Sequence, residues 1–127
     1  MGGKADYSLS EYMVHGATTS LGATPVASYI PVPYDGTIIE SFVAVGGTTA
    51  LTGVSTTTLA VLPAGVVADA VNVGTTLVLA SGAAVGRNAM AVHTGARSVR
   101  AGDTIRLTPA GATGASVVGN YSVKIKR

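Results

Sequence analysis

The sequence has no cysteine and no tryptophan, and it has a single phenylalanine among 127 residues. Without cysteine the chain can form no disulfide bond, and it offers no thiol nucleophile and no thiolate metal ligand. Without tryptophan it lacks the largest aromatic surface on which a bound sugar could stack. These absences exclude several classes of catalytic and binding site before any motif is considered.

Charge is also scarce, because only 11% of the residues are charged, against about a quarter in an average protein. The few charges are unevenly distributed. Residues 1–69 carry five acids and one base, whereas residues 70–127 carry seven bases and one acid. A surface so poor in charge suits a close-packed assembly, and the asymmetry suits head-to-tail contact between copies. The bases are scattered singly and no aromatic side chains are interleaved with them, so no nucleic-acid partner is expected.

Long hydrophobic runs are missing as well. The first ten residues, MGGKADYSLS, contain no apolar stretch of the kind found in a signal peptide. Residues 41–68 carry no charge, but glycines and Pro63 interrupt them, which is unlike a membrane-spanning helix. We therefore expect no membrane partner.

Threonine, valine and glycine dominate what is present, and they favour strands and turns. The clearest stretch is 27–47, ASYIPVPYDGTIIESFVAVGG. It predicts a strand, a turn at Asp35-Gly36 and a second strand, paired as a β-hairpin. In the second strand Ile39, Ser41, Val43 and Val45 should share one face.

Further strands are predicted at 56–63, 75–82, 87–93, 104–109 and 117–127, with no convincing amphipathic helix. The segment 75–82 is apolar on both faces and should be central. In 87–93 one face should be exposed to solvent; its residues are Arg87, Ala89, Ala91 and His93. The lysines of the last strand suit an exposed edge. Residues 64–74 are either a short helix or a loop with a strand fragment.

This spacing predicts an all-β protein: a single antiparallel two-sheet β-sandwich, with either jelly-roll or immunoglobulin-like topology. The sandwich should comprise residues 26–127. Residues 1–25 should form an irregular N-terminal arm or linker, although SLSEYMVHG also fits one short strand or a helical turn.

No arrangement of residues predicts catalysis, a metal site or a cofactor. His15 and His93 are isolated, and the sequence contains no nucleophile elbow and no phosphate-binding glycine loop. Asp35 and Asp103 are explained by their turns. Glu40 shares a face with apolar residues. An edge position or a partner such as Arg106 is favoured for it over the role of a poised acid. We expect no enzyme activity.

Candidate contact residues are aromatic or basic. Four tyrosines precede residue 35, and two arginines flank Ser98 and Val99. For the tyrosines, contact with a neighbouring subunit is favoured over a sugar site. For the arginines, exposed solubilising charge is the favoured role and salt bridges between subunits are the main alternative. The candidates are Tyr7, Tyr12, Tyr29, Tyr34, Arg97 and Arg100.

Four segments together resemble small virion proteins of tailed phages. They are YIPVPYDGTIIESFVAVGG, TTTLAVL, SVRAGDTIRLTPAG and the closing YSVKIKR. In that group an Ile-Pro and Gly-Thr-Ile hairpin precedes alternating Thr/Val strands, an Ala-Gly-Asp turn and a final basic strand. The resemblance covers residues 26–127.

The resemblance implies a capsid decoration or cement protein located on the surface of the virion. Its partners would be the major capsid protein of a phage head and further copies of itself, as a homotrimer. The alternative is a carbohydrate- or receptor-binding sandwich of a phage fibre or tail. Exposed aromatics near a polar pocket would favour that alternative.

Overall fold

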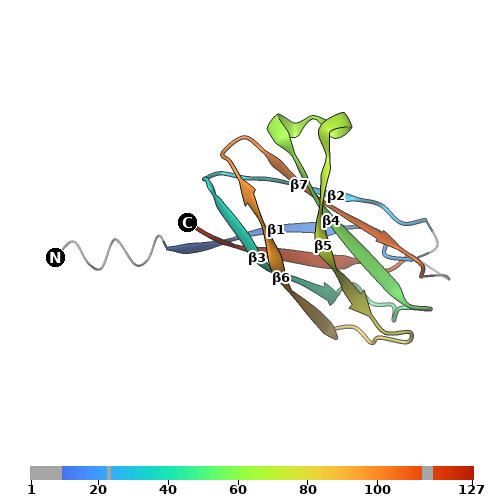
Figure 1. Ribbon diagram of the computed structural model, residues 1–127. Coiled ribbons are helices and arrows are strands. Elements are labelled where there is room, and N and C mark those ends of the chain that lie inside the picture. The colour runs from blue at the N-terminus through green and yellow to red at the C-terminus, as the bar shows by residue number, and fades with distance from the viewer. Residues whose placement is uncertain (1–9, 23, 113–115) are drawn as a thin grey trace.

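The computed structural model describes residues 10–22, 24–112 and 116–127, apart from the side chains of residues 95 and 96. The chain forms eight strands and two short 3-10 turns, η1 and η2 (Figure 1). The elements are β1 (Glu11–Thr18), β2 (Ser28–Pro31), β3 (Gly36–Val45), β4 (Ser55–Leu62), η1 (Pro63–Gly65), η2 (Val67–Asp69), β5 (Val71–Leu79), β6 (Asn88–Val99), β7 (Thr104–Ala110) and β8 (Gly119–Lys126).

Two four-stranded antiparallel sheets face each other, as the sequence predicts. Their strand orders are β1-β8-β3-β6 and β2-β7-β4-β5. Consecutive strands change sheet at every step except β4 to β5, which pair directly. An immunoglobulin fold would instead keep consecutive strands such as A and B in one sheet. Eight strands exchanged between two sheets in this order make a jelly roll, which decides between the two predicted topologies.

The core lies between the sheets and consists mainly of branched aliphatic side chains. In β7 Ile105 and Leu107 are fully buried, and in β8 Tyr121, Val123 and Ile125 are buried, as their alternation predicts. Tyr121 is the largest fully buried side chain, and its hydroxyl lies 2.9 Å from Oγ1 of Thr57 in the opposite sheet. The two sheets are therefore joined by a buried hydrogen bond as well as by apolar contact.

The predicted hairpin at 27–47 does not form. β2 pairs with β7, whereas β3 pairs with β6 and β8, so the Asp35-Gly36 turn carries the chain from one sheet to the other. Pro31 and Pro33 lack the amide hydrogens that a hairpin ladder would use. Pro31 is accommodated because β2 is an edge strand.

The faces of β3 also differ from simple alternation. A register shift between Ile38 and Glu40 reverses the pattern, so that Ile38 is fully buried together with Ser41, Val43 and Val45, while Ile39 is only half-buried. A β-bulge of this kind adds one residue and moves the following side chains to the other face.

Three predictions about strand position were wrong. β5 is an edge strand whose Val78 is exposed, so it is not central. β8 is an inner strand between β1 and β3, so its lysines do not protect an edge. In β6, His93 is buried and Met90 and Val92 are exposed, the reverse of the expected facing.

The sandwich begins earlier than residue 26. Glu11–Thr18 is the edge strand β1, paired with β8 along its whole length. The strand alternative for SLSEYMVHG is therefore correct for residues 11–18, and these residues belong to the sandwich and not to an arm. Residues 1–9, including Tyr7, lie outside the described part of the chain.

Candidate functional site

One end of the sandwich collects the 32–35, 63–70 and 100–103 connections together with the C-terminal residues of β8 (Figure 1, upper left). We call this the loop end. It follows from the jelly-roll order, because alternate strand connections emerge at the same end of the sandwich.

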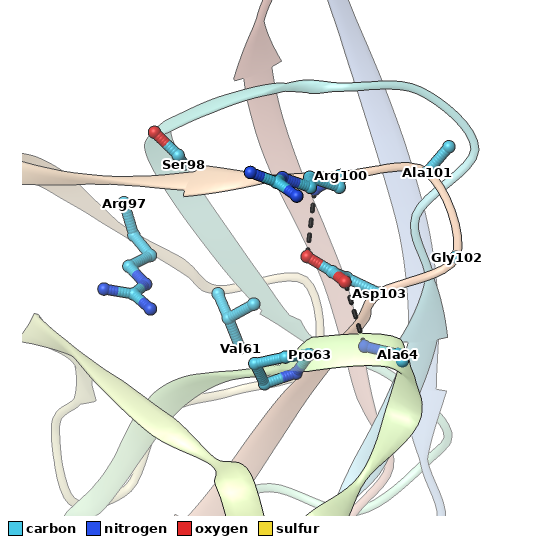
Figure 2. Close-up of a pocket in the computed structure, with 9 residues that line it drawn as sticks. All are labelled: Val61, Pro63, Ala64, Arg97, Ser98, Arg100, Ala101, Gly102 and Asp103. Carbon is cyan, nitrogen blue, oxygen red and sulfur yellow. Dashed lines mark hydrogen bonds between the residues drawn. The ribbon is translucent and has the colours of Figure 1, made fainter.

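Asp103 joins two of these connections. Its Oδ2 accepts a hydrogen bond from the Arg100 amide at 2.9 Å, and its Oδ1 accepts one from the Ala64 amide at 3.0 Å (Figure 2). Ala64 has a φ of 52°, in the left-handed region that non-glycine residues rarely adopt. The carboxylate thus closes the β6–β7 turn and also holds the strained β4–β5 turn against it.

Asp35 ties the β2–β3 connection to the β6–β7 turn. Its Oδ1 accepts a hydrogen bond from the Ala101 amide at 2.9 Å. Both aspartates were predicted to act within their own turns, and the structure gives each of them a partner in another connection. Each carboxylate therefore fixes how the loops sit relative to one another.

Arg97 and Arg100 line a cavity of about 670 Å³ between the β6–β7 connection and the end of β4. Figure 2 shows both guanidinium groups on the side of the cavity away from Gly102. Arg97 lies opposite Ile38 in the ladder and shares the inward face of β6 with Val99, so it points between the sheets. Its Nε atom is buried without a hydrogen-bond partner in the described part of the chain.

A tyrosine cluster lies at the same end. The rings of Tyr12 and Tyr34 meet edge to face, with centroids 5.7 Å apart, and the Tyr12 hydroxyl donates to the Tyr34 carbonyl. The guanidinium carbon of Arg127 lies 5.0 Å from the centroid of the Tyr34 ring, a cation–π contact. Partial burial raises the pKa of Tyr12, so its hydroxyl keeps its proton and remains a donor.

A second cavity of about 610 Å³ joins the two groups, since it is lined by Asp35, Arg100 and Arg127 among others. The structure therefore brings four predicted contact residues to one end: Tyr12, Tyr34, Arg97 and Arg100. Tyr29 does not join them, because it projects from β2 opposite Arg106 on the outer face of the other sheet.

The prediction missed three features of the loop end. Arg127 was interpreted only as part of a basic strand. The tip of the β4–β5 connection exposes Val66 and Val67, with the carboxylate of Asp69 beside them. Adjacent valines inside the glycine- and alanine-rich PAGVVADA are the signal that could have indicated an exposed tip.

Several ionisable residues outside the loop end have structural partners. Lys124 bridges Glu11 at 3.5 Å and Glu40 at 3.6 Å on the outer face of the first sheet, so Glu40 does not use the expected partner Arg106. His93 is buried and its Nε2 lies 2.8 Å from Ser41 Oγ, and burial lowers its pKa. His15 Nδ1 lies 2.9 Å from Ser122 Oγ. No group of three metal-ligating side chains occurs within residues 10–22, 24–112 and 116–127.

No protein-family model matches the chain, and no curated protein sequence does. Among solved structures, the chain is similar to the structure of the Eiger TNF from S. frugiperda, with 11% identity, coverage of 92% of each chain and a TM-score of 0.48. In the described residues no helix is long and apolar enough to cross a membrane.

Proposed function

We propose that this chain is a structural protein of a tailed-phage virion, a decoration or cement protein that binds the outside of the head as a homotrimer. The sequence resemblance over residues 26–127 supports this function. The single structural observation in its favour is the concentration of contact-forming groups at the loop end, where exposed tyrosine, arginine and valine side chains lie together on tied loops.

The composition of that end suits contact with protein. Tyrosine and arginine are enriched at the centres of protein interfaces, whereas lysine and glutamate are depleted there. At the loop end Tyr34 and Val67 are each more than half exposed, and Arg127 is exposed beside Tyr34. Such side chains bury apolar area and donate hydrogen bonds to a partner.

A cement protein stabilises a shell because it binds the assembled lattice better than free capsid subunits. Each site in an oligomer can be weak, since the sites bind at a high effective concentration once one of them is occupied. A rigid sandwich that presents tied loops at one end loses little conformational entropy when it binds.

The carbohydrate- or receptor-binding alternative receives less support. Tyr29, an aromatic candidate for stacking a sugar, is exposed on the face of the second sheet, and it lines neither of the two loop-end cavities. Tyr34 is engaged by Arg127 and Tyr12.

The test is the composition and stability of the virion of the phage that encodes the chain. We expect the protein in purified particles at a fixed ratio to the major capsid protein, and we expect heads that lack it to lose DNA at lower temperature. Adding back the purified chain should restore their stability. Particles that contain none of it, or heads that do not bind it, would refute the function.

A further inference from the structure

The charged side chain of Arg97 has no acidic partner in the described chain. Arginine is almost never buried unless it is paired. Arg97 is half-buried as a whole, but it points between the sheets with its Nε atom buried and without a hydrogen-bond partner, and no described acid forms an ion pair with it. Arg106 also has a buried Nε without a partner, but it lines neither of the two loop-end cavities. Arg97 combines the unpaired group with an open cavity and a second arginine.

Asp103 lines the same cavity, but its carboxylate does not pair with Arg97. Both oxygens of Asp103 accept backbone amide hydrogens, from Ala64 and Arg100. Asp103 forms no ion pair with Arg97 or Arg100 in the described structure. The cavity therefore presents two guanidinium groups that can donate to an incoming oxyanion.

Asp69 is the one acidic residue in the described part of the chain whose carboxylate has no partner. Glu11 and Glu40 are bound to Lys124, and Asp35 and Asp103 accept backbone amides. The side chain of Asp69 has no hydrogen bond or ion pair among the described residues. It is exposed on η2, at the same loop end as the arginine cavity, next to the exposed valines of the β4–β5 tip.

We propose that the Arg97–Arg100 cavity is a carboxylate-binding site, and that its occupant is Asp69 of a second copy of this chain. The planar fork of a guanidinium matches a carboxylate with two parallel hydrogen bonds. In the proposed homotrimer the contact is heterologous, because each copy places its Asp69 in the cavity of the next copy around a closed ring. Val66 and Val67 enter the interface with Asp69 and lose their exposure to water.

This inference rests on the homo-oligomer of the proposed function, and it supplies the contact that forms it. The test measures the dissociation constant of the full-length chain by sedimentation velocity. We expect Asp69→Lys and Arg97→Glu each to weaken association by at least about tenfold, because each places like charges together. The double variant carries the reversed pair and should recover most of the wild-type affinity.

Arg87→Glu is the matched control. Arg87 is exposed and precedes β6, at the opposite end of that strand from Arg97, so the same charge change there should leave association unaltered. Because Arg97 points inward, its variant is checked for folding by circular dichroism, and Arg100→Glu replaces it in the cycle if it fails. High salt should weaken the wild-type contact.

Three results would overturn the proposal. In the first, the charge reversals leave the dissociation constant of the oligomer unchanged. In the second, the single variants weaken association but the double variant does not restore it. In the third, the wild-type chain is monomeric and inorganic phosphate shifts the Arg97 Nε resonance. The last result would assign the cavity to a small oxyanion. None of them bears on whether virions contain the protein, so failure here is distinguishable from failure of the proposed function.

Discussion

The buried hydrogen bond between Tyr121 and Thr57 offers a quantitative test of how the two sheets are held together. Both residues are at most 2% exposed, and the oxygens lie 2.9 Å apart across the core. Burial raises the pKa of Tyr121 to about 12, so the hydroxyl stays protonated at any ordinary pH. The bond is thus a neutral pair that water cannot replace.

Tyr121→Phe removes one hydroxyl and leaves Thr57 Oγ1 buried without a partner. Thr57→Val does the reverse with little change in volume. Each single variant should lower the free energy of unfolding by about 1–3 kcal/mol, since an unpaired buried polar group bears its full desolvation cost. The double variant leaves no unpaired hydroxyl, so it should cost about as much as one single variant. The coupling energy is then on the order of 2 kcal/mol.

The measurement is equilibrium unfolding in urea, with the free energies of all four proteins taken at a common m-value. Thr58→Val is the control, because Thr58 lies on the same strand, faces outward and is half-buried. It should change stability by no more than about 0.5 kcal/mol. Additive single variants would refute the argument, because independent effects would mean that the hydroxyls do not satisfy each other.

Three further perturbations follow from the structure. His93 is buried and its pKa is lowered, so the unfolded chain takes up a proton near pH 6.5 while the folded chain does not. The free energy of unfolding should therefore fall as the pH drops below 6.5. His93→Gln should reduce this pH dependence in urea titrations at pH 7.5 and 5. Asp103→Ala removes two hydrogen bonds that tie the loops and should cost on the order of 2 kcal/mol, with faster amide exchange at residue 64; unchanged exchange there would contradict the tie. Gly119→Ala would place a Cβ 2.8 Å from the side chain of Leu21, a fully buried residue; overpacking should cost about 1–3 kcal/mol, and Leu21→Ala in the same chain should recover part of it.

Side-chain alternation predicted the core well where strands are regular. In β7 and β8 every second residue is buried, and the sequence shows this directly. In β3 the alternation failed at the bulge after Ile38, because one extra residue reverses the facing without leaving a turn signal. In β6 the larger side chains Met90 and Val92 face water. Small Ala91 and the hydrogen-bonded His93 fit between the sheets instead.

Pairing between strands was harder to predict than the strands themselves. The Asp35-Gly36 signal identified a turn correctly, but a turn does not state whether its strands stay in one sheet. The jelly roll is decided by contacts between residues far apart in sequence, such as Thr18 with Gly119. Local propensity carries no information about such pairs, so the sequence left two topologies open.

The candidate site was predictable in its residue types and not in its geometry. Arg97 lay beyond the strand predicted at 87–93, whereas β6 continues to Val99. Only this continuation puts Arg97 on the inward face. Asp69 and Arg127 become candidate contact residues only at the loop end, where connections about 30 residues apart in the sequence lie together.

The hydrogen bonding of the loop end itself argues that its charge is balanced by another molecule. The carboxylates of Asp35 and Asp103 are directed at backbone amides, which stabilises the turns and leaves the guanidinium groups of Arg97 and Arg100 without ion pairs in the described chain. An oxyanion in the cavity would give the buried Nε atom of Arg97 the hydrogen-bond partner that the described chain does not supply. The tied loops hold the cavity open in advance, so a partner that supplies the oxyanion has little ordering entropy to overcome. The same aspartates therefore rigidify the loops and leave the arginines available for a neighbouring subunit.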